Sequence, residues 1–339
     1  MTAQLELTCE PVTLNLKTTF RIAHGASDQR YNVIVHLGEG LGEGAGVPYL
    51  GETQAGIMEY LQQAADRLDG DPFLIEDLLG RLPPGSRSAR AAIDIALHDL
   101  WGKRLGQPLY RLLGLNPQKM PETSFTIAID EPGRMAELAR QSGYPLIKIK
   151  LGSPEDEAIV RAVRAATGAR LQVDANSGWE REQAARLVPR LAAYGLEMVE
   201  QPLSMGDIDG LRWLRRELRR QHIDVPIFAD ENIKTARDVA AHAGVVDGVV
   251  IKLMKTGGIR EALRAIHTAR ALDMQVMIGC MVETSLGVTA AAHLAPLCDY
   301  ADLDGPLLIR DDPFQGVCYA GSLMRLPDRP GLGVMRIKA

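Results

Sequence analysis

The sequence predicts an α/β protein whose larger part is a (β/α)8-type barrel, in a modified (β/α)7β form, preceded by an α+β capping domain. Two observations carry this prediction. From residue 122 onward, short apolar runs alternate with amphipathic stretches of about ten to fifteen residues, which is typical of parallel strands joined by helices. Before residue 116, strand-like alternation comes first and helical periodicity follows, which is typical of an α+β unit.

Composition and charge narrow the class of protein. The chain has 339 residues, of which 46% are hydrophobic and 24% charged, and this composition fits a soluble globular protein. A formal net charge of −5 argues against nucleic acid or an anionic membrane surface as a partner. No apolar run is long enough to span a bilayer, and the N-terminus lacks the pattern of a signal peptide. The four cysteines are scattered without metal-ligand spacing, so we expect reduced thiols in a cytoplasmic protein.

The capping domain is expected over residues 1–115. Its first part, up to about residue 50, alternates apolar and polar residues and becomes glycine-rich over 38–46. This pattern predicts a small antiparallel sheet with hairpin turns. Segments 17–25 and 47–52 are candidate loops beside a site. The helices expected after them cover about 53–67 and 88–104.

The barrel is expected over residues 116–315, and the last segment, 316–339, is expected to pack back on the capping domain. A doubly wound open sheet is the structural alternative, but no GxGxxG fingerprint follows a first strand. The predicted strands are 124–129, 146–150, 170–174, 198–200, 227–229, 249–252, 276–278 and 300–303. The predicted helices between them are 132–142, 155–166, 180–194, 207–220, 236–243, 258–272 and 285–295.

Three carboxylates follow successive predicted strands: Asp174, Glu200 and Asp230. In a (β/α)8 barrel the carboxyl ends of the strands meet at one face and carry the functional groups. Three carboxylates at one mouth repel one another unless a cation lies between them, and oxygen ligands suit Mg²⁺. One such aspartate would often be a helix N-cap. Three in register, flanked by lysines, instead predict one Mg²⁺ per subunit.

Lysines occupy the ends of two other predicted strands. Lys148 and Lys150 lie on one face of the strand 146–150, because side chains alternate along a strand. Burial and like charge on one face would favour the neutral amine that a general base needs. An edge strand with solvated lysines is the alternative; the acidic strand ends further along the chain argue against it. Lys252 would face Lys150 across the barrel, and we prefer it to Lys255 because it directly follows a buried run.

This arrangement fits one chemical problem. A proton α to a carboxylate is very weakly acidic, because its removal places a second negative charge on the carboxylate. Mg²⁺ would stabilise the resulting enediolate. Lys150 and Lys252, on opposite faces of the carbon, would remove one proton and return another, so that the configuration at that carbon is inverted.

The strand-end motifs as a set resemble those of the dipeptide epimerases, in the muconate-lactonising branch of the enolase superfamily. The resemblance covers nearly the whole chain, including a capping domain. It implies a Mg²⁺-dependent isomerase that inverts the α-carbon of the second residue of a dipeptide such as L-Ala-L/D-Glu. The motifs are KIK (148–150), DANSGW (174–179), EQP (200–202), ADEN (229–232), IKLMKTGG (251–258), GCMVETS (279–285) and DLDGP (302–306).

The resemblance also implies roles for the substrate-binding residues. Lys148 would contact the substrate carboxylate and help to lower the pKa of Lys150. Asp302 and Asp304 would receive the α-ammonium of the dipeptide. Arg21 in the first capping loop would pair with the side-chain carboxylate of the second residue. The further residues expected to line the site are Tyr49 in the second capping loop and Cys280 and Met281 after the seventh strand.

Other functions on the same scaffold stay open at this point. An N-acylamino acid racemase, an o-succinylbenzoate synthase or a muconate cycloisomerase would need the same lysines and metal, but none has a free ammonium for Asp302 and Asp304. A non-catalytic scaffolding protein would have no reason to keep both lysines and all three carboxylates. His98 and His293 lie in helical patterns, and we interpret both as structural. Barrels of this kind often associate, so a homo-oligomer is expected.

Overall fold

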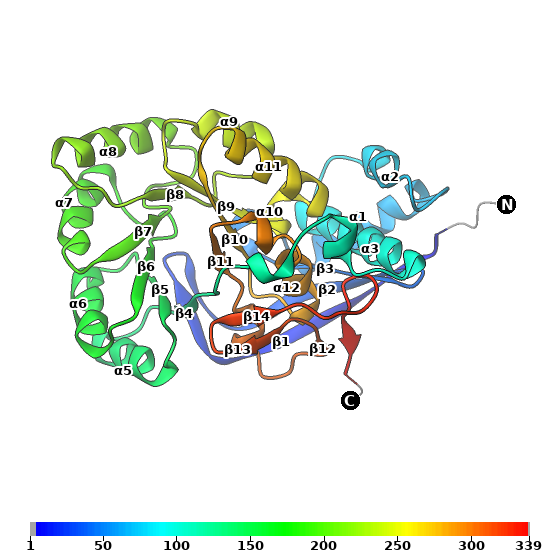
Figure 1. Cartoon of the computed structure of the whole chain (residues 1–339), viewed down its shortest axis with the longest axis horizontal. Helices are drawn as coiled ribbons and strands as arrows, with labels where there is room; N and C mark the ends of the chain where they lie inside the picture. The colour runs from blue at the N-terminus through cyan, green and yellow to red at the C-terminus, as the bar shows by residue number, and fades with distance from the viewer. Residues whose placement is uncertain (1–4, 338–339) are drawn as a thin grey trace.

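The computed structural model describes residues 5–337 and contains an eight-stranded parallel sheet. The strands pair in chain order, from β4 at one edge to β11 at the other (Figure 1). The two edges also meet, because the backbone N–H of Ser124 donates to the carbonyl of Ala301 (3.1 Å) and Thr123 forms a parallel bridge with Ala301. The sheet is therefore a barrel, and the predicted fold class is confirmed. The strands are β4 (Phe125–Ile127), β5 (Leu146–Lys150), β6 (Arg170–Asp174), β7 (Leu196–Glu200), β8 (Ile227–Ala229), β9 (Gly248–Lys252), β10 (Gln275–Gly279) and β11 (Tyr300–Asp302).

Helices connect the strands and cover the outside of the barrel (Figure 1). β5, β6 and β8 have the bounds predicted from sequence, and the other strands differ by at most two residues at either end. One short helix, α10, was not predicted and turns the chain sharply after β9. The helices are α5 (Pro132–Ser142), α6 (Asp156–Ala166), α7 (Arg181–Ala192), α8 (Ile208–Arg220), α9 (Ala236–His242), α10 (Leu253–Thr256), α11 (Ile259–Ala271) and α12 (Ser285–Ala292).

The amino end of the barrel interior is filled by large apolar side chains. Met198, Phe228, Val250 and Met277 form one buried cluster there. Gly248 makes room for this packing, because a Cβ at that position would overlap the ring of Phe228. This cluster closes the amino end of the barrel, and the carboxyl ends of the strands form its open end.

The first part of the chain forms an antiparallel sheet that packs on a helix. Two positions of its edge strand, residues 40–44, have no room for a side chain, because a Cβ at Gly40 or Gly42 would overlap the carbonyl of Ala96 or Ala92 in the helix 87–105. β3 therefore lies directly on the α3 backbone. The elements of this part are β1 (Leu7–Ile22), β2 (Gly25–Leu37), β3 (Gly40–Gly44), α1 (Gln54–Ala64), α2 (Ile75–Arg81), α3 (Arg87–Leu105) and α4 (Leu109–Leu112).

A buried carboxylate joins this sheet to the open end of the barrel. Glu43 in β3 accepts hydrogen bonds from the backbone N–H groups of Thr284 (3.0 Å) and Gly287 (2.9 Å), at the start of α12. The amide of Asn32 also donates to Glu43 (2.8 Å) and to the carbonyl of Val282 (3.1 Å). The β1–β2 hairpin is thereby held over the loop that follows β10.

The last part of the chain contacts both units. The backbone N–H of Leu332 donates to Asp99 in α3 (2.8 Å), and that of Leu109 donates to the carbonyl of Gly331 (2.8 Å). The backbone N–H of Thr123 donates to Ser322 (2.9 Å) beside β4. The strands of this segment are β12 (Phe314–Gln315), β13 (Cys318–Ala320), β14 (Leu323–Arg325) and β15 (Met335–Arg336).

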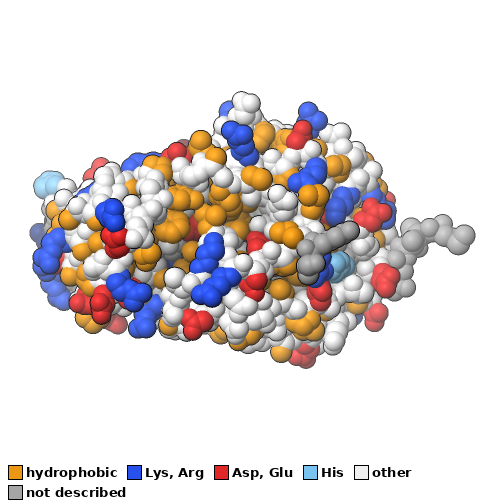
Figure 2. Space-filling model, turned by 90° about the horizontal axis from the view of Figure 1, so that it is seen from below, with side chains coloured by type: hydrophobic (Ala, Val, Ile, Leu, Met, Phe, Trp, Pro, Cys, Tyr) orange, Lys and Arg blue, Asp and Glu red, His pale blue; other side chains and the backbone are white. Residues whose placement is uncertain are grey.

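The surface is mixed in character. Seen from below, Figure 2 shows charged side chains spread over the face and apolar side chains gathered around a recess. Within residues 5–337, no helix is both long and apolar enough to cross a membrane.

We predict that His293 makes stability depend on pH. Its Nδ1 accepts from the backbone N–H of Tyr110 (3.1 Å) and its Nε2 donates to the carbonyl of Leu332 (3.2 Å), and burial lowers its pKa from 6.5 to about 4. The unfolded chain therefore takes up a proton between these values and the folded chain does not. Stability present above pH 6.5 is lost as the pH falls towards 4, by on the order of 3 kcal/mol.

Denaturant unfolding of wild type and His293→Gln across this pH range tests the prediction. The variant should be less stable at neutral pH and should lose less stability on acidification. His267→Gln, at an exposed position, is the matched control and should behave as wild type. Parallel pH profiles for wild type and His293→Gln would contradict the assignment.

Candidate functional site

Charged side chains gather at the open end of the barrel, and all of them are buried. Register explains the gathering, because Lys150, Asp174 and Glu200 pair in sequence across β5, β6 and β7 and so lie at one level. On the other side, Lys252, Gly279 and Asp302 pair across β9, β10 and β11 in the same way. A Cβ at Gly279 would lie 3.1 Å from Cε of Lys252, so glycine at this position leaves space for the lysine.

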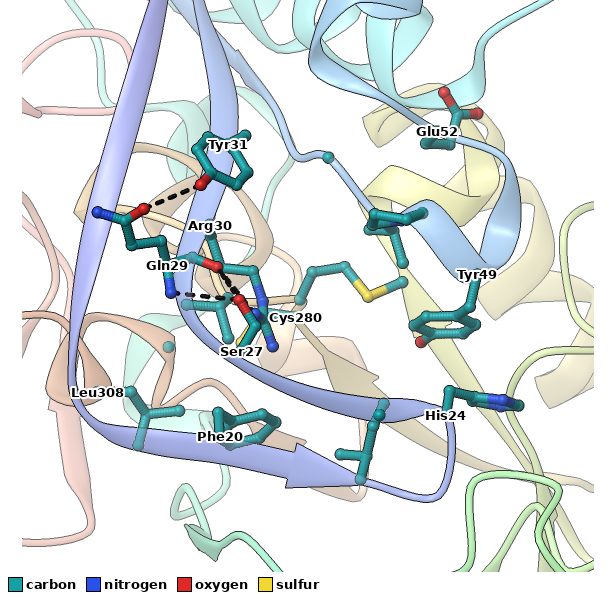
Figure 3. A pocket seen from close by; sticks show the side chains of 18 of the residues that line it. Phe20, His24, Ser27, Gln29, Arg30, Tyr31, Tyr49, Glu52, Cys280 and Leu308 are labelled. Atoms are coloured by element: carbon teal, nitrogen blue, oxygen red, sulfur yellow. Dashed lines mark hydrogen bonds between the residues drawn. The ribbon is translucent and has the colours of Figure 1, made fainter.

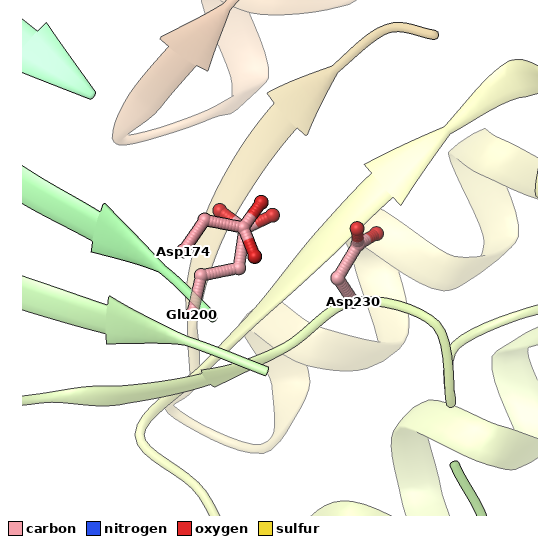
Figure 4. A group of neighbouring side chains, drawn as sticks. All are labelled: Asp174, Glu200 and Asp230. Atoms are coloured by element: carbon pink, nitrogen blue, oxygen red, sulfur yellow. The ribbon is translucent and has the colours of Figure 1, made fainter. Parts of the chain in front are cut away.

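Asp174, Glu200 and Asp230 converge on one point. One oxygen of each lies within 4.8 Å of the others, and all three residues are buried. In Figure 4 the carboxylates of Asp174 and Glu200 meet and that of Asp230 faces them. Oε1 of Glu200 is buried and accepts no hydrogen bond from residues 5–337. Buried carboxylate oxygens normally accept a hydrogen bond or bind a cation. An unpaired oxygen in a cluster of three carboxylates therefore fits the role of a Mg²⁺ ligand.

Two lysines flank this cluster from opposite sides. Nζ of Lys150 lies 2.7 Å from Oδ2 of Asp174, and Nζ of Lys252 lies 2.8 Å from Oδ2 of Asp230. Their strands, β5 and β9, are four positions apart in a closed sheet of eight, so the two lysines come from opposite sides of the barrel. This is the arrangement that the sequence predicted for the pair.

The expectation that burial and like charge favour a neutral amine was wrong for Lys148. Burial alone would lower the pKa of Lys148, but the carboxylates around it raise its pKa well above the ordinary value. Its Nζ lies 2.7 Å from both Glu200 and Asp302. Burial lowers the pKa of Lys252 as well, but Asp230 and Glu200 together more than offset this, so its pKa is also raised. Repulsion between lysines on one face is therefore weaker than attraction to the neighbouring carboxylates.

Lys255 occupies a different place from Lys252. It lies on α10 rather than on β9, and its Nζ contacts the carbonyls of Asp230 and Val250 and the carboxylate of Asp230. Burial lowers its pKa. Its ammonium is thus held behind the carboxylate, whereas Lys252 lines the cavity described below.

Asp302 and Asp304 are held by the first strand of the barrel. Asp302 accepts from the hydroxyl of Ser124 (2.8 Å) and Asp304 from the backbone N–H of Thr126 (2.6 Å). Burial and the nearby Asp302 raise the pKa of Asp304 to about 7. Two neighbouring buried carboxylates of this kind form a strong site for a cation.

Two family models match the chain. The model described as mandelate racemase/muconate lactonizing enzyme, N-terminal domain, matches residues 4–114, and the model described as enolase C-terminal domain-like matches residues 133–336. This chain belongs to the mandelate racemase/muconate lactonizing enzyme family. The resemblance inferred from the strand-end motifs is thereby confirmed.

Relatives in this family are named as epimerases and racemases, which are isomerases. The L-Ala-D/L-Glu epimerase of Bacteroides thetaiotaomicron is 39% identical, over 98% of this chain and 88% of the relative. A dipeptide epimerase of Enterococcus faecalis V583, solved with Mg and L-Leu-L-Tyr, has a TM-score of 0.91 at 35% identity, covering 98% of this chain and 99% of the other. An N-succinyl Arg/Lys racemase of Bacillus cereus has a TM-score of 0.93 at 30% identity, covering 99% and 96%.

The N-terminal antiparallel sheet and the open end of the barrel enclose a cavity of about 650 Å³ above the carboxylates. Lys150, Lys252, Asp302 and Asp304 line its floor, together with Cys280 and Met281, as expected from the sequence. Walls and roof come from the β1–β2 hairpin and the segment around Tyr49 (Figure 3). Tyr49 stacks on His24 with ring centroids 4.6 Å apart, so the two capping loops meet over the cavity, and burial raises the pKa of Tyr49.

Arg21 is not brought to this cavity. Phe20 and Ile22 line it, and because side chains alternate along a strand, Arg21 between them is exposed on the other side. Arg30 on β2 lines the cavity instead. Sequence reasoning also missed Asn176, whose amide donates to Asp174 (3.3 Å) and Glu231 (3.2 Å). Its place two residues after Asp174, within the DANSGW motif, was the available signal.

We predict that Mg²⁺ binds to the three carboxylates. Calorimetric titration of wild type with MgCl₂ should show one site, and Glu200→Gln should weaken binding by more than about 100-fold. This follows because loss of a residue that only orients a ligand already costs about 10- to 100-fold. Asp209→Asn, which changes an exposed carboxylate, is the control and should bind as wild type. Equal affinity of Glu200→Gln and wild type would place the metal elsewhere.

Proposed function

We propose that this protein is a Mg²⁺-dependent dipeptide epimerase that inverts the α-carbon of the second residue. The observation that carries the proposal is the placing of Lys150 and Lys252 on opposite sides of a three-carboxylate cluster. An aspartate pair lies on the same rim. In this proposal, only Lys150 and Lys252 transfer protons.

The aspartate pair supports a dipeptide rather than an N-acylated amino acid. Asp302 and Asp304 line the cavity and add negative charge to its floor. A free N-terminus carries one positive charge and three N–H donors, which two carboxylates can accept. The amide of an N-acyl substrate has no such charge. Asp302 would keep its ion pair with Lys148, but Asp304 would remain buried without a cationic partner among residues 5–337, which is unfavourable.

At the other end of the substrate, Lys148 and the three-carboxylate cluster would hold the α-carboxylate. Mg²⁺, when bound by Asp174, Glu200 and Asp230, supplies positive charge where negative charge develops. Lys148 keeps its ammonium among Glu200, Asp302 and Asp174, so it would donate to the carboxylate and take no proton. With both ends fixed, the α-carbon would lie between the two remaining lysines.

Inversion follows from the two opposed lysines. A neutral Lys150 or Lys252 would take the α-proton on its side, and the protonated lysine on the other side would return a proton to the opposite face. Each lysine would thus act as base in one direction and as acid in the other. Removal of either one should lower the rate of epimerisation by at least about 10²- to 10⁴-fold, the usual contribution of a positioned acid or base.

The competing reaction on this scaffold is racemisation of N-acylamino acids. The similarity to the N-succinyl Arg/Lys racemase supports this alternative. The objection based on the aspartate pair applies to o-succinylbenzoate synthase and muconate cycloisomerase activities as well, because their substrates also lack an α-ammonium. The aspartate pair is the feature that discriminates among these candidates.

One assay tests the proposal. Wild-type protein with Mg²⁺ in D₂O is incubated with a library of L,L-dipeptides and, separately, with N-succinyl amino acids, and mass spectrometry reads the gain of one deuterium. We expect deuterium at the α-carbon of the second residue of dipeptides and at least tenfold slower exchange in the N-succinyl series. Faster exchange in the N-succinyl series would favour the racemase instead, and exchange in neither series would reject both reactions.

A further inference from the structure

Arg30 is a cation in the cavity wall, and residues 5–337 provide no acidic partner for it. The lysines of the floor, Lys150 and Lys252, are each paired with a carboxylate. Arg30 lines the same cavity, is half-buried, and forms no ion pair with any residue between 5 and 337. Buried cations are normally paired, so this exception needs an explanation.

The contacts of Arg30 leave most of its donors free. Its Nη1 donates to the carbonyl of Gln29 (3.0 Å), and its guanidinium carbon lies 5.7 Å from the centre of the Phe20 ring. A guanidinium has five N–H donors in a planar fork. The fork is therefore oriented by the ring and by one backbone carbonyl, and most of it can bind another group.

The pairing of β2 fixes the direction of this side chain. Arg30 lies opposite Leu14 in the β1–β2 ladder, and residues directly opposite share a face of the sheet. Leu14 packs with Val282 and Ile309 of the barrel, and Asn32, two residues along β2, donates to the carbonyl of Val282. This face of the hairpin is thus turned to the barrel, and Figure 3 shows Arg30 among the side chains that line the cavity, together with Cys280, Phe20 and Leu308.

The surroundings would strengthen an ion pair formed with Arg30. Phe20, Ile22 and Leu308 give the cavity apolar walls, which can contact the methylene groups of a long side chain and exclude water from its end. Burial lowers the pKa of Arg30, but a guanidinium keeps its charge. A carboxylate that reaches it would be bound through two hydrogen bonds in a region of low dielectric constant.

We propose that Arg30 binds the side-chain carboxylate of the substrate, so that this enzyme selects acidic dipeptides. The inference rests on the proposed dipeptide epimerase function, and it assigns to Arg30 the role that the sequence led us to expect of Arg21. The two ends of the dipeptide already have partners, namely the metal cluster with Lys148 and the aspartate pair. A second carboxylate on the substrate, in the side chain of its second residue, would give Arg30 an acidic partner.

A matched substrate series tests the assignment. Wild type and Arg30→Met are assayed with Mg²⁺ on L-Ala-L-Glu, L-Ala-L-Gln and L-Ala-L-Met, whose second side chains are similar in length. Wild type should prefer the Glu substrate. Arg30→Met should lose about 10- to 100-fold in kcat/KM for the Glu substrate, as expected when a hydrogen bond to a charged group is removed, with less than threefold change for the Met substrate.

Further variants separate charge from packing and from position. Arg30→Lys keeps the charge without the fork and should fall between wild type and Arg30→Met. Arg216→Met, at an exposed position on α8, should match wild type with every substrate. Loss of Glu selectivity in Arg21→Met, with Arg30→Met unaffected, would overturn the assignment. So would an equal loss for all three substrates in Arg30→Met, because that is the result of altered packing.

The failure of this inference differs from failure of the proposed function. A wild-type enzyme that epimerises L-Ala-L-Met well and L-Ala-L-Glu poorly would overturn the inference and leave the epimerase function intact. Absence of epimerisation with all dipeptides would overturn both.

Discussion

Mutual neutralisation of buried lysines and carboxylates is the interaction on which this site depends. Neither set could be buried at the barrel end alone, because an unpaired ion loses its hydration without compensation. Lys150 with Asp174 and Lys252 with Asp230 form two close pairs on opposite sides, and Lys148 bridges Glu200 and Asp302. These same residues have roles in the proposed reaction. Asp174, Glu200 and Asp230 would bind Mg²⁺, and the lysines and Asp302 would contact the substrate.

The fold separates this chemistry from selectivity. The barrel strands supply every charged group of the floor, in register from strand to strand, whereas the hairpin and the segment around Tyr49 supply walls and roof. Glu43 and Asn32 fasten the hairpin to the loop after β10, so a change of wall residue need not disturb the floor. Such a division is typical of folds in which loops on a rigid scaffold carry the specificity.

The barrel could be predicted from the sequence because its signals are local. The strands are short, largely apolar runs that are buried on both faces. Five of the eight end at a charged residue, and Asp230 directly follows a sixth, so strand bounds and the cluster of Asp174, Glu200 and Asp230 could be predicted together. The hairpin could not be predicted to the same depth. The β1–β2 register shifts between Asn15 and Phe20, and a shift of one residue exchanges the two faces of a strand. Arg30 faces the cavity because it pairs with Leu14, before that irregularity, and this pairing cannot be inferred from either strand alone. The raised pKa of Lys148 could not be predicted from the sequence either, because it depends on Asp302, which lies 154 residues away along the chain.

The central claim is that two lysines act on opposite faces of one carbon, and α-proton exchange by single-lysine variants tests it most directly. Lys150→Ala and Lys252→Ala are each incubated in D₂O with the L,L- and the L,D-forms of one accepted dipeptide. Neither variant should epimerise, yet each should still exchange the α-proton of one diastereomer, and the two variants should differ in which one. Exchange confined to the same diastereomer in both variants, or epimerisation that survives the loss of either lysine, would contradict the account.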